Sequence, residues 1–137
     1  MPSRAVILLA LIAGSGASRA LAHHSFAAEF DYDLTGRIEG VVVEVLYVNP
    51  HARYFLEVTD ESGETVLWDV QSRSPSALQR IGWTSDTITL GETVAIEGNL
   101  GLNNTRKIWL QEVTLSSGER IRADGQEPSA VAAESED

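Results

Sequence analysis

Residues 37–48 read RIEGVVVEVLYV. The run is rich in β-branched residues and contains no proline, so it predicts a long β-strand with a bend or bulge at Gly40. A small barrel needs one long, bent strand, because closure requires that strand to serve both sides. This stretch therefore favours a closed β-barrel.

The residues that follow predict a hairpin. Asn49-Pro50 marks a turn. In the segment 51–59, HARYFLEVT, apolar and polar residues alternate, which predicts a second strand with one buried face. The segment 60–63, DESG, closes the hairpin, and residues 65–70 return as a third strand.

After the third strand, the spacing of the apolar residues changes and predicts one short helix. Ser74 suits the N-cap, Pro75 suits the first helical position, and Gly82 suits the left-handed position at the C-terminal end. A helix between them would bury Leu78 and Ile81.

Two more strands are predicted at residues 92–99 and 107–115, joined by the polar loop 100–106. Three strands, one helix and two strands is the element order of the OB fold, a five-stranded barrel with its helix between strands three and four. We therefore predict a mainly β, OB-like barrel. A five-stranded β-sandwich with a surface helix is the alternative.

The N-terminus has the three parts of a secretory signal peptide. Arg4 precedes the apolar run 5–13, and small residues lead to Ala20-Leu21-Ala22. The run falls short of the roughly 20 residues that span a bilayer. We expect cleavage after Ala22, a periplasmic location and no membrane attachment after cleavage. Retention of the run as a membrane anchor is the alternative.

The expected domain plan has four parts. They are a signal peptide at 1–22, an N-terminal arm at 23–34, an OB-like domain at 35–122 and a disordered acidic tail at 123–137. The chain has no cysteine, so no disulfide supports the fold. Its formal charge is −10, which becomes more negative when the leader is removed, and this charge disfavours nucleic acid as a partner.

Three histidines are the candidate metal ligands: His23, His24 and His51. If the leader ends at Ala22, His23 carries a free α-amine beside its imidazole, and the pair can bind one metal ion. OB folds bind ligands with the loop between strands 1 and 2, where His51 lies. An arm that folds back would bring His23 to that loop.

Nitrogen ligands suit copper, zinc and nickel, and the affinity order puts copper(II) first. His24, Glu29 or Asp31 could complete the ligand shell. The alternative is that His23 and His24 form a solvated end and that His51 is a turn residue bonded to the backbone.

The tryptophans offer a second candidate site. Trp68 and Trp83 are expected to fill the barrel, whereas Trp109 neighbours the 100–106 loop and could stack on a ligand. A charged patch of Arg53, Glu57 and Arg73 beside His51 is explained equally well as a solvated strand face.

The chain resembles a family of small exported proteobacterial proteins of unknown function. The resemblance is carried by AHHSF at 22–26, NPHA at 49–52, Trp68, and the segment from Ser74-Pro75 through Leu78 to Gly82-Trp83. It implies export and a single domain, and it links the His-His start to the Asn-Pro-His turn. It implies no chemistry. Arg53 departs from the aromatic or aliphatic residue expected after NPHA.

These observations predict a periplasmic metal-binding module, with copper the expected metal. The alternative is a metal-free module for a peptide, a small molecule or a protein partner, which would bind near Trp109 and the 100–106 loop. An enzyme with an oxidative copper centre is less favoured. The chain contains no P-loop, nucleophile-elbow or H-E-x-x-H motif, and no catalytic residue is predicted.

Overall fold

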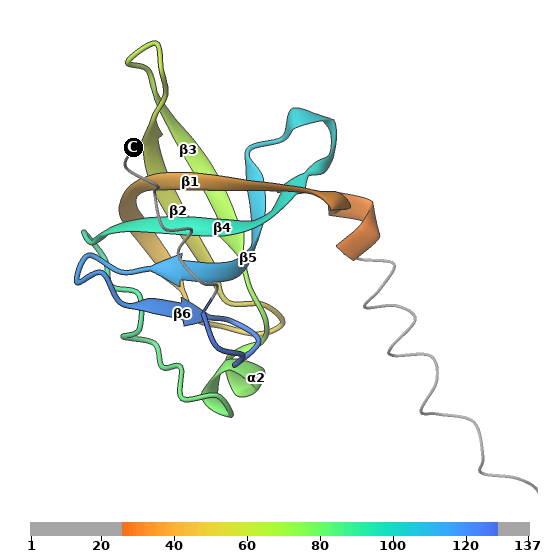
Figure 1. Ribbon diagram of the computed structural model, residues 1–137, viewed down its shortest axis with the longest axis vertical. Helices are drawn as coiled ribbons and strands as arrows, with labels where there is room; N and C mark the ends of the chain where they lie inside the picture. Colours follow the sequence, from red (N-terminus) through yellow and green to blue (C-terminus); the bar gives the residue numbers. More distant parts are fainter. Residues whose placement is uncertain (1–25, 129–137) are drawn as a thin grey trace, which may run out of the picture.

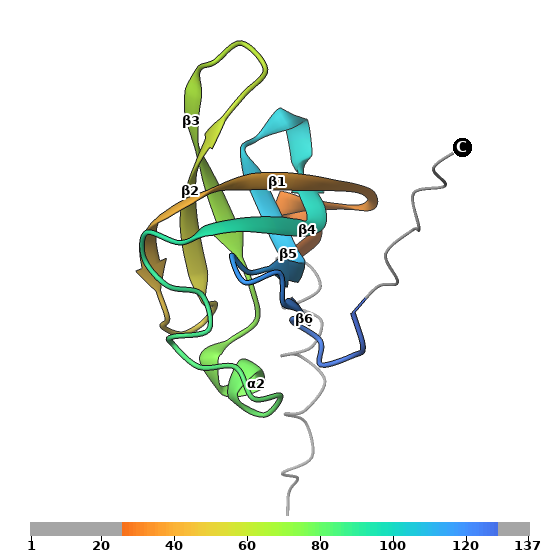
Figure 2. The same cartoon turned by 60° about the vertical axis from the view of Figure 1, so that its left-hand side comes forward.

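The computed structural model describes residues 26–128, and its strands curl into a barrel (Figures 1 and 2). A short helical turn at 26–29 precedes the first strand. The elements that follow are β1 (Phe30–Leu46), β2 (Arg53–Thr59), β3 (Thr65–Gln71), α2 (Pro75–Gln79), β4 (Thr93–Gly101), the 3-10 turn η1 (Leu102–Asn104), β5 (Lys107–Thr114) and β6 (Arg120–Arg122).

The sheet order is that of an OB barrel. The strands follow one another as β3-β2-β1-β4-β5-β6, and a parallel pairing between β3 and β5 closes the ring. That pairing joins Asp69–Gln71 to Lys107–Trp109, three residues on each side. The predicted OB-like barrel with a helix between strands three and four is confirmed, and β6 adds a sixth strand that the sequence did not predict.

The first strand begins at Phe30, so residues 30–34 of the expected arm belong to β1. Phe30 is 2% exposed and pairs with Gly101 of β4. The register shifts between Phe30 and Thr35. Across this irregular part, the side-chain amide of Asn99 donates to the carbonyl oxygens of Asp31 and Tyr32. Because a remote side chain holds this part of the strand, residues 30–34 need no alternation of apolar and polar residues, and the sequence did not predict them as a strand.

The bend of β1 depends on Gly40 and on a bulge after it. A Cβ atom at Gly40 would lie 2.3 Å from the carbonyl oxygen of Glu57, so only glycine allows β2 to approach here. The register between β1 and β2 shifts between Val42 and Glu44. The predicted irregularity therefore exists, with the bulge a few residues beyond the glycine.

The core contains the inward-facing residues of the strands. Tyr54 and Leu56 of β2 are fully buried, as their alternation predicts. Trp83 fills the barrel, since it is 2% exposed and its Nε1 donates to the Tyr54 hydroxyl at 3.2 Å. Burial raises the pKa of Tyr54 to about 12. Trp68 is half-buried and packs against the same core.

The helix α2 forms where the capping residues predict it. The Ser74 hydroxyl accepts a hydrogen bond from the Ala77 N–H, and Pro75 is the first helical residue. Leu78 is fully buried, and Gly82 has a φ of +88°, in the left-handed region. Ile81 is only partly buried, which differs from the prediction.

The C-terminal boundary also differs from the prediction. Ala123, expected to begin the tail, is 2% exposed, and its N–H donates to the Gln111 carbonyl at 2.9 Å. Gly125 lies against Ile81, because a Cβ atom added there would be 2.7 Å from Ile81 Cγ2. Residues 123–128 thus follow the barrel, and the rest of the predicted tail lies outside the described residues. Between 26 and 128, no helix is long and apolar enough to cross a membrane.

Candidate functional site

His51 lies in the β1–β2 loop, directly after the cis peptide bond between Asn49 and Pro50. The loop is fixed to the chain that leaves β3, because the Ala52 N–H donates to the Arg73 carbonyl at 3.0 Å. The Ala52 carbonyl in turn accepts from the Ser72 N–H at 2.9 Å. His51 is half-buried, and its backbone is therefore held in place.

Trp109 is the aromatic centre of this end of the barrel. Its ring lies edge-on to the His51 ring, with centroids 5.3 Å apart. Phe26 and Phe30 approach the same indole at 5.4 and 5.8 Å. Phe26 also packs on Tyr32 at 4.6 Å. His51 and the start of the described chain are thus separated by a single indole ring.

An ion pair fastens the helical turn at 26–29 beside this cluster. Lys107 Nζ lies 2.9 Å from the Glu29 carboxylate, and both side chains are partly exposed. Residues 26–29 of the expected arm therefore lie against the start of β5, whereas the predicted ligands His23 and His24 fall outside the described residues.

A cluster of polar side chains lies next to these rings, on the outer face of β2 and β3. Arg53 donates to both carboxylate oxygens of Asp69, at 2.6 and 3.2 Å. This hydrogen bonding raises the pKa of the Arg53 guanidinium above its ordinary value. Gln71, 6% exposed, donates to Asp69 at 3.3 Å, and Arg53 also lies over the Phe55 ring at 5.2 Å. Glu29 and Glu44 also lie close enough to act electrostatically on the Arg53 guanidinium, so acids outnumber bases around it.

The described residues alone do not form a metal centre. In the range 26–128, no group of three or more His, Asp or Glu side chains could hold a metal ion. Two acids proposed as further ligands have partners, since Glu29 pairs with Lys107 and Asp31 accepts the Asp33 N–H at 2.8 Å. A metal at His51 would therefore need further ligands from outside residues 26–128.

Sequence reasoning missed three residues of this site: Asp69, Gln71 and Lys107. The alternation of β3 could have placed Asp69 and Gln71 outside, on the face that carries Arg53. The contact of His51 with Trp109 depends on closure of the barrel between β3 and β5, and no local pattern encodes that closure. The same holds for the pair of Glu29 with Lys107.

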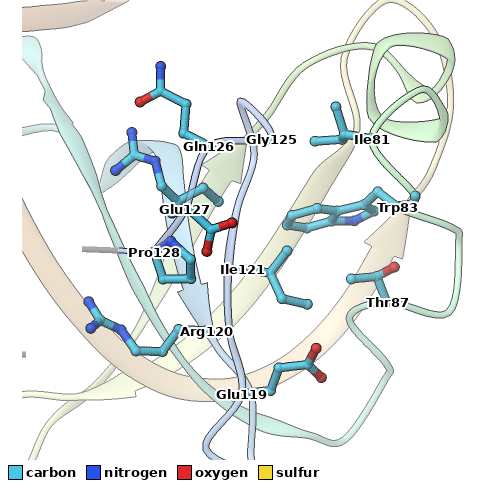
Figure 3. A pocket seen from close by; sticks show the side chains of 12 residues that line it. Ile81, Trp83, Thr87, Glu119, Arg120, Ile121, Gly125, Gln126, Glu127 and Pro128 are labelled. Atoms are coloured by element: carbon cyan, nitrogen blue, oxygen red, sulfur yellow. The ribbon is translucent and has the colours of Figure 1, made fainter. Parts of the chain in front are cut away.

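A separate pocket of about 360 Å³ lies between the loop after α2 and β6 (Figure 3). Trp83 and Ile121 face one another in it, and Ile81 adds a third apolar wall. The Arg122 guanidinium, which also lines the pocket, is paired with Asp124 at 2.7 Å. Of the predicted site residues that the structure describes, His51, Arg53 and Trp109 do not line this pocket.

The fold and the ring cluster define an OB-type barrel whose N-terminal segment packs on β5 at the β1–β2 loop. The chain belongs to a family of unknown function, DUF6152, which matches residues 10–109. This range includes all three histidines. A comparison with curated proteins found no match.

Among solved structures, the chain is similar to the mitochondrial single-stranded DNA binding protein Rim1 of S. cerevisiae in two crystal forms. The TM-scores are 0.46 and 0.47, the identities are 13% and 12%, and the matches cover 61% of this chain and 94% and 92% of Rim1. Yeast Stn1 and Ten1 match at a TM-score of 0.38 and 16% identity, over 74% of this chain and 55% of that chain. At these scores the similarities carry no argument for function.

Proposed function

We propose that this chain is an exported, periplasmic metal-binding module that holds copper(II) between its processed N-terminus and His51. The ligands are the α-amine and imidazole of His23, one imidazole nitrogen of His51 and, as a further donor, His24. Zinc and nickel are the alternative metals, because they also take imidazole nitrogen.

The observation that supports the proposal is the shared contact with Trp109. Phe26 and His51 lie against the same indole, at 5.4 and 5.3 Å between ring centroids. His23 precedes Phe26 by three residues, and three extended residues reach about 10 Å. The position of Phe26 beside this indole therefore supports a metal shared by His23 and His51.

The donor chemistry fits a borderline metal. An α-amine has a pKa of about 8, so it loses its proton near neutral pH when a metal competes for it. Two imidazoles and one amine give an all-nitrogen set, which copper(II) binds more tightly than nickel or zinc. The acidic composition attracts cations of any kind, and the histidine nitrogens favour transition metals among them.

The test is a calorimetric titration of copper(II) into protein that begins at His23. We expect one site with a Kd tighter than about 1 μM, and a loss of at least about ten-fold when His51→Ala removes one ligand. A protein with one glycine before His23 is the control for the amine, and it should bind more weakly by a similar factor. Absence of binding tighter than micromolar, or unchanged binding by His51→Ala, contradicts the proposal.

Tryptophan fluorescence gives a second, local measurement. Copper(II) quenches nearby indoles, and Trp109 is the tryptophan whose ring touches His51. Copper(II) should therefore quench the wild-type emission, and Trp109→Phe should remove most of the quenching. Mass spectrometry of the exported protein tests the start at His23.

The competing function is a metal-free module that stacks a ligand on Trp109. The rings of Phe26 and Phe30 already lie against this indole, which disfavours an open platform. Metal analysis of protein isolated from periplasm without chelators distinguishes the two functions.

A further inference from the structure

The strand β3 is paired unequally on its two sides. It pairs with β2 along its whole length, from Thr65 to Gln71. It pairs with β5 only from Asp69 to Gln71, because β5 begins at Lys107. Among the described residues, 65–68 therefore have a strand neighbour on the β2 side alone.

Two hydrogen bonds show which backbone groups face the open side. The Ser72 N–H donates to Ala52 on the β2 side, and the Asp69 N–H donates to Arg106 on the β5 side. Backbone groups of successive residues alternate between the two sides of a strand. The N–H and C=O groups of Thr65 and Leu67 accordingly point to the open edge.

The edge lacks lysine and proline, two residues that commonly block strand addition. Residues 65–68 read TVLW, without lysine or proline, and the Leu67 side chain is 53% exposed. The β2–β3 hairpin also projects beyond the barrel at the end opposite α2 (Figures 1 and 2). An extended segment could reach this edge without displacing a strand.

The surrounding charge identifies the kind of segment. Glu57 is the cross-strand partner of Leu67, Glu64 directly precedes Thr65, and Asp60 and Glu61 form the hairpin turn. A second copy of the chain would bring these acids against their own equivalents, at a formal charge of −10 for each chain. A basic partner would meet opposite charge from these acids, of which Asp60 also interacts with the nearby Arg106.

We propose that residues 65–68 of β3 are a docking edge for an extended, basic segment of a partner protein, which adds to the sheet as a strand. Backbone hydrogen bonds to Thr65 and Leu67 would supply the pairing. Leu67 would offer an apolar contact, and the acids around the hairpin would select for lysine or arginine. This edge lies at the opposite end of β3 from Ala52 and His51, so it does not depend on the metal proposal.

The test uses a synthetic peptide of alternating lysine and valine and follows amide hydrogen exchange by NMR. The amides of Thr65 and Leu67 should exchange at least about ten-fold more slowly with the peptide bound. The amides of Val66 and Trp68 face β2 and should change little. A peptide of the same sequence that is N-methylated at alternate residues has the same charge but cannot pair, and it should give no protection.

A proline variant removes one backbone N–H donor from the open edge and leaves the pairing with β2 intact. The Leu67 N–H faces away from β2, so Leu67→Pro keeps the ladder with β2, and edge strands tolerate proline. Its peptide affinity should fall about ten-fold, as expected for the loss of one or two hydrogen bonds. Leu67→Thr, which keeps the N–H, is the matched control, and the melting temperature reports whether each variant is folded.

Charge selection is tested separately with Glu57→Gln, compared with Glu119→Gln in the turn before β6. The first should weaken binding of the lysine peptide, and the second should not. The proposal is overturned if the N-methylated peptide protects the same amides, or if a folded Leu67→Pro protein binds the peptide like wild type. It is also overturned if the peptide leaves the exchange of Thr65 and Leu67 unchanged.

Discussion

Ser72 is fully buried where the chain leaves β3, and its hydroxyl has no hydrogen-bond partner among the described residues. Its backbone N–H, by contrast, donates to the Ala52 carbonyl and holds the β1–β2 loop. A buried hydroxyl without a partner costs about 1–3 kcal/mol. The side chain therefore reduces stability at the place where the backbone supports the His51 loop.

Replacement of this hydroxyl should stabilise the protein. We expect Ser72→Ala to raise the free energy of unfolding by about 1 kcal/mol, because it removes a desolvation cost and no backbone bond. Urea unfolding measures the change, and the exposed Ser85→Ala is the control. A loss of stability would show that the hydroxyl makes a stabilising contact in solution.

At this scale, the sequence identified His51 but not its surroundings. The Asn-Pro-His turn and the absence of cysteine were sufficient to select the residue. Its neighbour Trp109 comes from a strand more than fifty residues later, and their contact follows from barrel closure. Whether His23 meets His51 stays a prediction, since His23 lies outside the described residues.

The pairing of β4 with β5 depends on a single glycine, Gly98. A Cβ atom at Gly98 would lie 1.7 Å from the Trp109 carbonyl oxygen, where the register between β4 and β5 shifts. No rotamer can relieve this overlap, because both atoms belong to the backbone framework. The approach of the two strands beside Trp109 thus requires glycine.

Gly98→Ala should therefore destabilise the protein strongly. We expect a loss of about 3 kcal/mol or more in the free energy of unfolding, at the upper end of overpacking costs. Gly36→Ala is the matched control, because the atoms nearest to its Cβ would belong to the Leu100 side chain, at 2.9 Å, which can move. Urea unfolding of both variants should rank Gly98→Ala as clearly the less stable.

Local signals predicted the elements that have local causes. Ser74, Pro75 and Gly82 specify α2 by capping and backbone preference, and the structure confirms each role. The strand β6 has no such signal, since Arg120–Arg122 contains two arginines in three residues. It forms because it pairs with residues 112–114 of β5, and that neighbour is set by the fold.

For the whole molecule, the C-terminal boundary has a measurable consequence. A chain that ends at Arg122, the predicted domain limit, loses the buried Ala123 and its bond to Gln111. We expect it to be about 1–2 kcal/mol less stable than the full chain. A chain that ends at Pro128 keeps these contacts and should unfold like the full chain. Equal stability of both truncations would contradict the revised boundary.

The pH dependence of stability has one assignable contribution in this C-terminal segment. Hydrogen bonds from Arg122 lower the pKa of Asp124 from 3.8 to about 2. Because the folded pKa is the lower one, the pair stabilises the fold above about pH 4 and loses this effect as the pH falls toward 2. The carboxylate is partly exposed, so solvent screening keeps the effect small.

Asp124→Asn tests this contribution. The variant should be slightly less stable than wild type at pH 5, and the difference should vanish near pH 2, as measured by urea unfolding at both values. Asp86→Asn, in an exposed loop, is the control. A difference that persists at pH 2 would assign the effect to packing instead of charge.

The seam between β3 and β5 is only three residue pairs long, and it joins parts of the chain that are far apart in sequence. Closing the ring carries a loop-closure cost, and only three residue pairs offset that cost at this seam. We expect this seam to open more readily in the native state than the longer β1–β2, β1–β4, β2–β3 and β4–β5 pairings, and its opening would separate Trp109 from the loop that carries His51. A ligand bound to residues on both sides of the seam would slow this opening. Its binding would therefore lengthen the lifetime of the closed barrel.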